Sequence, residues 1–153
     1  MKVKLKKINI QNIHPELRVK KKLIQLLVED ILTSEKTNLS VDVIFVDDEF
    51  MRKLNKKFTK RDKTTDVLSF GMREGKSDAI EYPGLGDIYV SLDRAKRQAE
   101  EYRVGFEEEV ERLVTHGLLH LLGYDHKGKD KENIMRKKEE IYLKKMAKLL
   151  KSP

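Results

Sequence analysis

Apolar residues recur along the chain at two spacings, which predict alternating helices and strands. Steps of three and four residues, as in Leu23, Leu27 and Ile31, are typical of amphipathic helices. These steps predict helices over residues 15–32, 92–104, 106–122 and about 130–150, and a short helix through Phe50, Leu54 and Phe58. A run rich in β-branched residues predicts a strand over residues 39–46, and shorter segments predict strands over residues 2–10, 66–70 and 85–91.

Polar residues and glycines mark the ends of these elements. Asp47 or Asp48 can cap the short helix, and Ser91 can cap the helix that follows it. Gly123 is typical of a helix end, and residues 71–86, with four of the eight glycines, predict a loop. We therefore expect a single α+β domain over residues 1–153, with a small mixed four-stranded sheet covered by helices.

Charge is distributed unevenly along the chain. The net charge is +7, and residues 52–63 carry seven Lys or Arg against one Asp. Such segregation indicates basic surfaces that face a polyanion such as RNA or DNA, although lysine-rich helix faces can also simply be solvated. The absence of cysteine excludes disulfides and thiolate-ligated zinc. No apolar run is long enough to span a bilayer, so we expect a soluble, cytoplasmic protein with no membrane partner.

Three of the four histidines fall within eleven residues, in the run HGLLHLLGYDH. His116 and His120 are four apart on a predicted helix, so both rings lie on one face, and a turn at Gly123 lets His126 approach the same point. Structural zinc sites usually have four protein ligands and favour Cys. Three histidines therefore resemble a catalytic site for one Zn²⁺ ion with a position open to water, although another divalent metal is possible. Asp125 can orient a histidine N–H or serve the turn.

The spacing also matches the metzincin pattern HExxHxxGxxH, except that position 117 is Gly rather than Glu. That Glu is the general base of the peptidases with this pattern. A metallopeptidase with this chain would need a base from elsewhere, and the sequence identifies no general base. Gly117 also predicts a close contact between a helix and a strand.

The histidine run resembles the signature of the YbeY family of bacterial endoribonucleases. The segments TDVLSF (65–70) and GDIYVS (86–91) are similar to other blocks of that family, in the same order. The resemblance implies a zinc-dependent hydrolase that cleaves single-stranded RNA. It also implies a role in ribosomal RNA processing at the 3′ end of the small-subunit RNA and in ribosome quality control. Ribosomal RNA or the ribosome would be its partner, and the same three histidines would hold the metal. A non-catalytic RNA-binding module with a stabilising metal is the remaining alternative.

The chain departs from the family at the segment LNKKF (54–58). Members usually carry Arg directly after the aromatic residue, but here Thr59 follows, and then Lys60 and Arg61. Arg61 is our candidate for the scissile phosphate because guanidinium pairs bidentately with phosphate, although it can equally be an ordinary loop residue. Asp66 is a second catalytic candidate, near the metal or as a strand cap. The candidate RNA contacts are Lys56, Lys57, Lys60 and Arg61.

Overall fold

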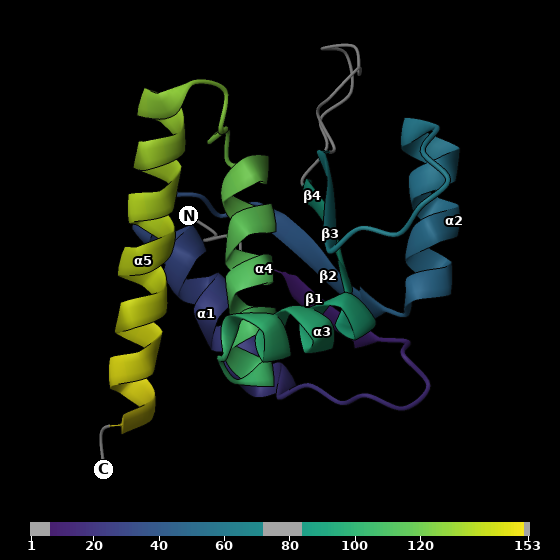
Figure 1. Ribbon diagram of the computed structural model, residues 1–153. Helices are drawn as coiled ribbons and strands as arrows, with labels where there is room; N and C mark the ends of the chain where they lie inside the picture. Colours follow the sequence, from purple (N-terminus) through teal and green to yellow (C-terminus); the bar gives the residue numbers. More distant parts are fainter. Residues whose placement is uncertain (1–6, 72–83, 152–153) are drawn as a thin grey trace.

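The computed structural model describes residues 7–71 and 84–151, which form a mixed sheet with helices on both faces (Figure 1). In chain order, the elements are β1 (Ile8–Asn12), α1 (Lys21–Ser34), β2 (Ser40–Val46), α2 (Asp48–Thr59), β3 (Val67–Gly71), β4 (Gly84–Ser91), α3 (Leu92–Tyr102), α4 (Phe106–Leu121) and α5 (Lys129–Lys151). The strand order is β1-β2-β4-β3, with β3 antiparallel to β4 and the other neighbours parallel. The predicted α+β class with four strands is confirmed.

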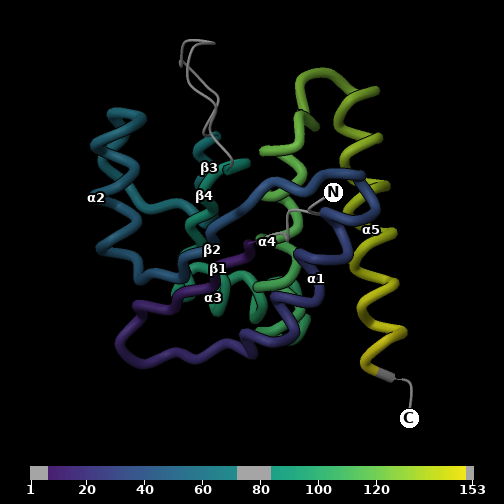
Figure 2. Tube along the Cα trace, turned by 180° about the vertical axis from the view of Figure 1, so that it is seen from behind, coloured from purple at the N-terminus to yellow at the C-terminus, as the bar shows by residue number. Residues whose placement is uncertain are grey.

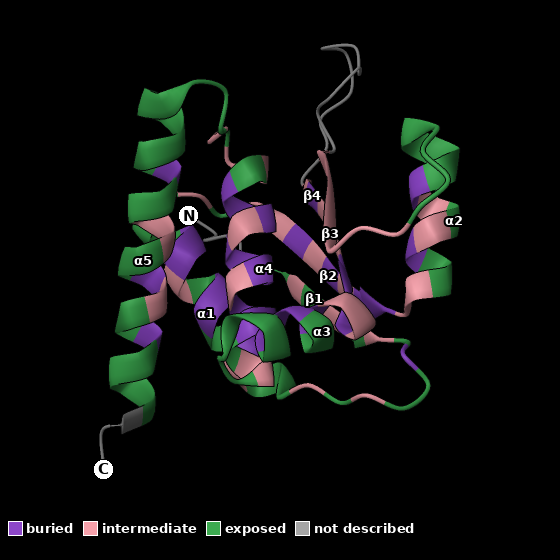
Figure 3. Ribbon diagram, viewed as in Figure 1, coloured by how far each residue is buried: buried purple, intermediate pink, exposed green. Residues whose placement is uncertain are grey.

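One face of the sheet forms the core. Val41, Val43 and Phe45 of β2 are buried because alternate residues of a strand point to the same side. They pack with buried residues of α1 and α4, and α5 lies outside these helices, as the buried positions in Figure 3 show. Met135 of α5 is part of this core.

Helix α2 lies on the opposite face, apart from α1, α4 and α5 (Figure 2). Two of its contacts with the sheet are between aromatic rings. The rings of Phe50 and Tyr89 stack with centroids 6.2 Å apart, and those of Phe58 and Phe70 are 5.0 Å apart. The sheet is therefore covered thickly on one face and by a single helix on the other.

The capping predictions are confirmed at two helices. The Asp47 side chain accepts a hydrogen bond from the N–H of Phe50 at 2.8 Å, and the Ser91 hydroxyl accepts one from Arg94 at 3.2 Å. The first helix begins at residue 21 rather than 15. The reason is His14, whose ring Nδ1 accepts the N–H groups of Glu16 and Leu17 and holds this stretch outside the helix.

Parts of two predictions lie outside the described residues. Of the strand predicted over residues 2–10, the structure describes only the last part, within β1, and residues 2–6 are outside it. Of the loop predicted over residues 71–86, residues 72–83 are outside, and β4 already begins at Gly84. Among the helices that are described, none combines the length and apolar character needed to cross a membrane.

Candidate metal centre

Helix α4 carries two of the three predicted metal ligands. His116 and His120 lie one turn apart on the same side of the helix. The helix ends at Leu121, and Gly123 follows with a φ of +103°, a backbone conformation that favours glycine. The predicted helix end at Gly123 is thus confirmed, and His126 follows in the segment that leads to α5.

The His116 ring is oriented by a carboxylate from another helix. Its Nδ1 atom lies 2.5 Å from Oε1 of Glu139 in α5. When Nδ1–H donates to this carboxylate, Nε2 is the atom left to ligate a metal. Metal-ligating histidines commonly have such a carboxylate partner, which fixes the tautomer and the ring orientation. Sequence reasoning missed Glu139 because no local spacing connects it to His116.

His116 and His126 line one cavity, which has a volume of about 390 Å³. Their ring centroids are 6.2 Å apart, and the ring planes are inclined by 31°. Two imidazoles that share a zinc ion at bond lengths of about 2 Å have centroids about 5 Å apart. The spacing of the two rings is therefore about one ångström wider than that of a shared ion. The other lining residues are Arg112, Glu132, Met135, Arg136 and Glu139.

His120 is exposed and does not line this cavity. Within residues 7–71 and 84–151, no group of three or more His, Cys, Asp or Glu side chains is arranged to hold a metal. The donor types nevertheless fit zinc, because imidazole is a common zinc ligand and His116 has its carboxylate partner. The three-histidine site remains a prediction, with two of its rings at one cavity.

Gly117 brings α4 against the sheet. A Cβ atom at this position would stand 2.8 Å from Cγ2 of Ile88 and 3.1 Å from Cγ2 of Val67. The Ser69 hydroxyl donates to the Gly117 carbonyl at 3.0 Å. The predicted close helix–strand contact is confirmed, and position 117 has no room for the glutamate of the peptidases.

The segment between Gly123 and α5 is anchored to α1 through a buried carboxylate. Glu35 accepts hydrogen bonds from the hydroxyls of Tyr124, at 2.6 Å, and Tyr142, and from the Lys138 ammonium at 3.1 Å. Burial raises the pKa of Glu35, but these three hydrogen bonds outweigh it and hold the pKa below its usual value. The charged carboxylate therefore joins the histidine segment to both α1 and α5.

The carboxylates of Asp125 and Asp66 each accept a backbone amide. Asp125 accepts from the N–H of Lys127 at 2.9 Å, and this bond is the main cause of its lowered pKa. Asp66 accepts from the N–H of Val67 at 2.8 Å, at the start of β3. Within the described part of the chain, neither carboxylate is hydrogen-bonded to a histidine ring. Their proposed roles near a metal stay predictions.

Arg112 is a cavity residue that sequence reasoning missed. It lies one turn before His116 on α4, so the same four-residue step that joins the histidines could have found it. Glu109 holds the guanidinium with contacts of 2.8 and 2.6 Å and is the main reason that its pKa is raised. The charges of Glu139 and Asp66 raise this pKa further.

Arg61 lines a different cavity, of about 630 Å³, between α2 and the start of β3. Lys56 lies 3.8 Å from the Asp62 carboxylate, and the Lys57 ammonium lies 5.4 Å from the centre of the Phe58 ring. Lys60 is exposed at the end of α2. The predicted RNA contacts thus gather around one end of α2, and the structure does not bring them into the histidine cavity.

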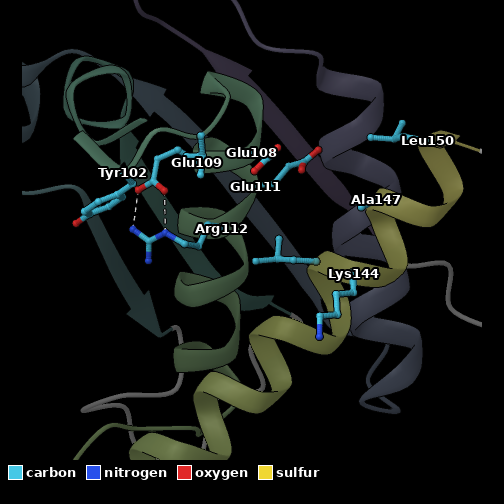
Figure 4. Close-up of a pocket in the computed structure, with 10 residues that line it drawn as sticks. Tyr102, Glu108, Glu109, Glu111, Arg112, Lys144, Ala147 and Leu150 are labelled. Carbon is cyan, nitrogen blue, oxygen red and sulfur yellow. Dashed lines mark hydrogen bonds and ion pairs between the residues drawn. The ribbon is translucent and has the colours of Figure 1, made fainter. Parts of the chain in front are cut away.

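A third cavity, of about 560 Å³, lies between α4 and α5 and shares Arg112 with the histidine cavity (Figure 4). Tyr102, Val104, Leu143, Ala147 and Leu150 supply its apolar wall, and Glu108 and Glu111 supply carboxylates. Burial, followed by the charges of Glu107 and Glu108, raises the pKa of Glu111. Arg112 and Lys144 also line this cavity, and Glu109 pairs with Arg112.

Comparisons with known proteins agree with these features. A family model described as "Endoribonuclease YbeY" matches residues 7–147. The endoribonuclease YbeY of Desulforamulus reducens is 42% identical over 145 residues, which cover 90% of this chain and 95% of that protein. The Aquifex aeolicus endoribonuclease YbeY is 47% identical over 114 residues, 74% of each chain.

A solved structure supports the same relationship. The solution structure of a Thermotoga maritima protein superposes with a TM-score of 0.64 at 32% identity and covers 91% of this chain and 88% of that one. Because the family model spans nearly all of the described residues and the relatives align over most of their own length, the chain belongs to the endoribonuclease YbeY family.

Proposed function

We propose that the protein is a zinc-dependent endoribonuclease that cleaves single-stranded RNA. Its substrate is ribosomal RNA at the 3′ end of the small-subunit RNA, and it acts in ribosome maturation and quality control in the cytoplasm. Family membership supports the endoribonuclease activity. The observation that carries the metal site is the cavity shared by His116 and His126, with Glu139 behind His116.

The residues that would hold the ion are His116, His120 and His126. When bound, zinc supplies a Lewis acid for a phosphoryl oxygen and lowers the pKa of a bound water. Glu139 accepts the Nδ1 proton of His116 and so keeps Nε2 unprotonated. The same three histidines can accept another divalent metal, since imidazole suits several.

The chain's own cations position the RNA. Arg112 stands at the histidine cavity with 35% of its side chain exposed, and Glu109 fixes the plane of its guanidinium. It can therefore pair with a phosphate oxygen near the reacting bond. The exposed cluster at the end of α2 supplies further contacts to the RNA backbone, from Lys56, Lys57, Lys60 and Arg61.

Metal analysis paired with RNA cleavage tests this proposal. We expect the purified protein to carry one zinc ion and to cleave a single-stranded RNA but not a duplex, and chelation should abolish cleavage. His116→Ala should lose both the metal and the activity. Glu139→Gln should weaken zinc affinity about 10–100-fold. Glu140→Gln is the matched control, because this neighbour is exposed and should leave metal and activity unchanged.

Two results would contradict the proposal. Undiminished cleavage by folded, metal-free His116→Ala would show that the histidines do not hold a catalytic ion. Zinc-dependent stability and RNA binding without any turnover would instead make the protein an RNA-binding module with a stabilising metal.

A further inference from the structure

Two phenylalanines on α2 are unusually exposed. Phe58 leaves 55% of its surface open and Phe50 leaves 41%. Each contacts a ring of the sheet, and Phe70 and Tyr89 also contact each other with centroids 5.9 Å apart. Contact with the sheet explains why one side of each ring is buried, but it does not explain why the other side is exposed to solvent. The open aromatic surface is therefore a candidate platform for a ligand.

A polar cavity adjoins these rings. Arg61, Lys63 and Arg94 line the 630 Å³ cavity beside α2, and none of its lining residues is acidic. Leu68 lines it too, and Leu68 pairs in register with Tyr89 of the aromatic row. Cations and aromatic rings thus meet along one groove between α2, residues 60–66 and the outer face of β3 and β4, which we call the α2 groove.

We propose that the α2 groove binds single-stranded RNA, with one base stacked on Phe58 and the backbone phosphates beside Arg61 and Lys63. Proteins that bind single strands combine these two features, because bases stack on aromatic rings while cations follow the phosphates. The proposal rests on the endoribonuclease function proposed above and identifies where the substrate is held outside the histidine cavity.

The charges of the groove set the orientation of the strand. In the part of the chain that the structure describes, Arg52 is engaged by Glu49 and Asp62, whereas the charged ends of Arg61 and Lys63 have no acidic partner. Those two cations are therefore free to receive phosphates.

At the other end of the same sheet face, two aspartates disfavour the phosphate backbone of the RNA. Asp42 and Asp87 face each other in register, and Phe70 is next to Asp87 in the same row. These carboxylates repel phosphates but can accept hydrogen bonds from the amino groups of bases. The backbone thus lies at the Arg61 end, and the bases point across Phe58 and Phe70.

The α2 groove leads to the histidine cavity across the edge strand β3. Leu68 and Phe70 point into the groove, while the alternate residue Ser69 points to α4, where its hydroxyl bonds to Gly117. At the start of this strand, Val67 packs against Gly117, the residue after His116 on α4. An RNA strand that leaves the groove over β3 therefore arrives beside the turn of α4 that carries His116.

Binding of a non-cleavable RNA tests the proposal without relying on catalysis. The probe is a short single-stranded RNA that contains 2-aminopurine and non-hydrolysable methylenephosphonate linkages, and the protein is the 153-residue, zinc-loaded chain. Phe58→Leu keeps an apolar side chain but removes the ring, so it should weaken binding about tenfold or more and abolish the fluorescence change of a stacked 2-aminopurine. Phe58→Tyr should restore both. Arg61→Gln should lower the slope of affinity against salt by about 0.7.

Leu26→Ala is the matched control, because Leu26 is 49% exposed on α1, across the sheet from α2, and this variant should bind as the wild type does. If the wild type binds and cleaves RNA while Phe58→Leu binds equally well with the same fluorescence change, the α2 groove is wrong and the endoribonuclease proposal stands. An equal loss in Phe58→Leu and Leu26→Ala would also overturn it. If the wild type neither binds nor cleaves RNA, both proposals fail together.

Discussion

Substitution of Gly117 by alanine tests whether close contact between α4 and the sheet supports the site. In an exposed helix, Gly→Ala stabilises by about 1 kcal/mol because alanine has the higher helix propensity. Here the new methyl group would stand 2.8 Å from Cγ2 of Ile88, which is fully buried and branched next to its own backbone. Neither side can yield without moving α4 or β4.

The magnitudes favour a net loss. Overpacking of this kind typically costs about 1–3 kcal/mol, and displacement of α4 also weakens the bond from the Ser69 hydroxyl, worth about 1 kcal/mol. Against a propensity gain of about 1 kcal/mol, Gly117→Ala should destabilise the protein by about 1–3 kcal/mol. Because His116 is the preceding residue, the same displacement should lower zinc affinity.

Urea unfolding followed by circular dichroism measures the first effect, and zinc titration measures the second. Gly105→Ala is the control, because no atom lies within 4 Å of its Cβ position and its φ of −70° suits alanine. Because Gly105 is the N-cap of α4, where glycine is preferred to alanine, the control should lose at most about 1 kcal/mol and leave zinc affinity unchanged. If Gly117→Ala proved more stable than the wild type, with unchanged zinc affinity, the contact would not constrain the site.

Three further predictions concern other buried groups. Burial raises the pKa of Glu111 in the folded state. The stability that Glu111 contributes is therefore full at low pH and is lost as the pH rises through its folded-state pKa. In urea melts, Glu111→Gln should make the free energy of unfolding depend less on pH. His14→Ala should cost about 3 kcal/mol in thermal melts, because it removes bonds to Asp93 and two backbone amides, yet leave zinc content unchanged. Tyr124→Phe removes the hydrogen bond that holds the histidine segment to Glu35. The loss of zinc affinity in a zinc titration should therefore be larger, as a free energy, than the loss of stability in thermal melts.

Much of the fold could be predicted because local patterns determine it. Helix α4 begins at Phe106 as its spacing predicts, and Gly123 ends it because a positive φ favours glycine. The first helix was predicted six residues too early, because periodicity does not reveal that the His14 ring takes up the amides of the preceding loop. The hydrophobic pattern gives His14 no structural role, so it does not predict that this side chain binds backbone amides that a helix would otherwise use.

The site was predictable only where its residues share one element. His116 and Arg112 are one turn apart on α4, so their common side follows from the sequence. Glu139 reaches His116 from 23 positions away, and no repeat or spacing marks it among the charged residues of α5. Whether His120 joins the other two histidines is likewise a question of side-chain placement, which helical spacing does not determine.

The placement of His126 depends on contacts far from it in sequence. Tyr124 fixes the segment before it to Glu35 at the end of α1, and Tyr142 of α5 bonds to the same carboxylate. That helix also brings Glu139 to His116. A single carboxylate on α1 therefore aligns both the segment and the helix that complete the histidine cavity. Because these bonds span 89 and 107 positions, the histidine cavity forms only when α1, α4 and α5 have packed together.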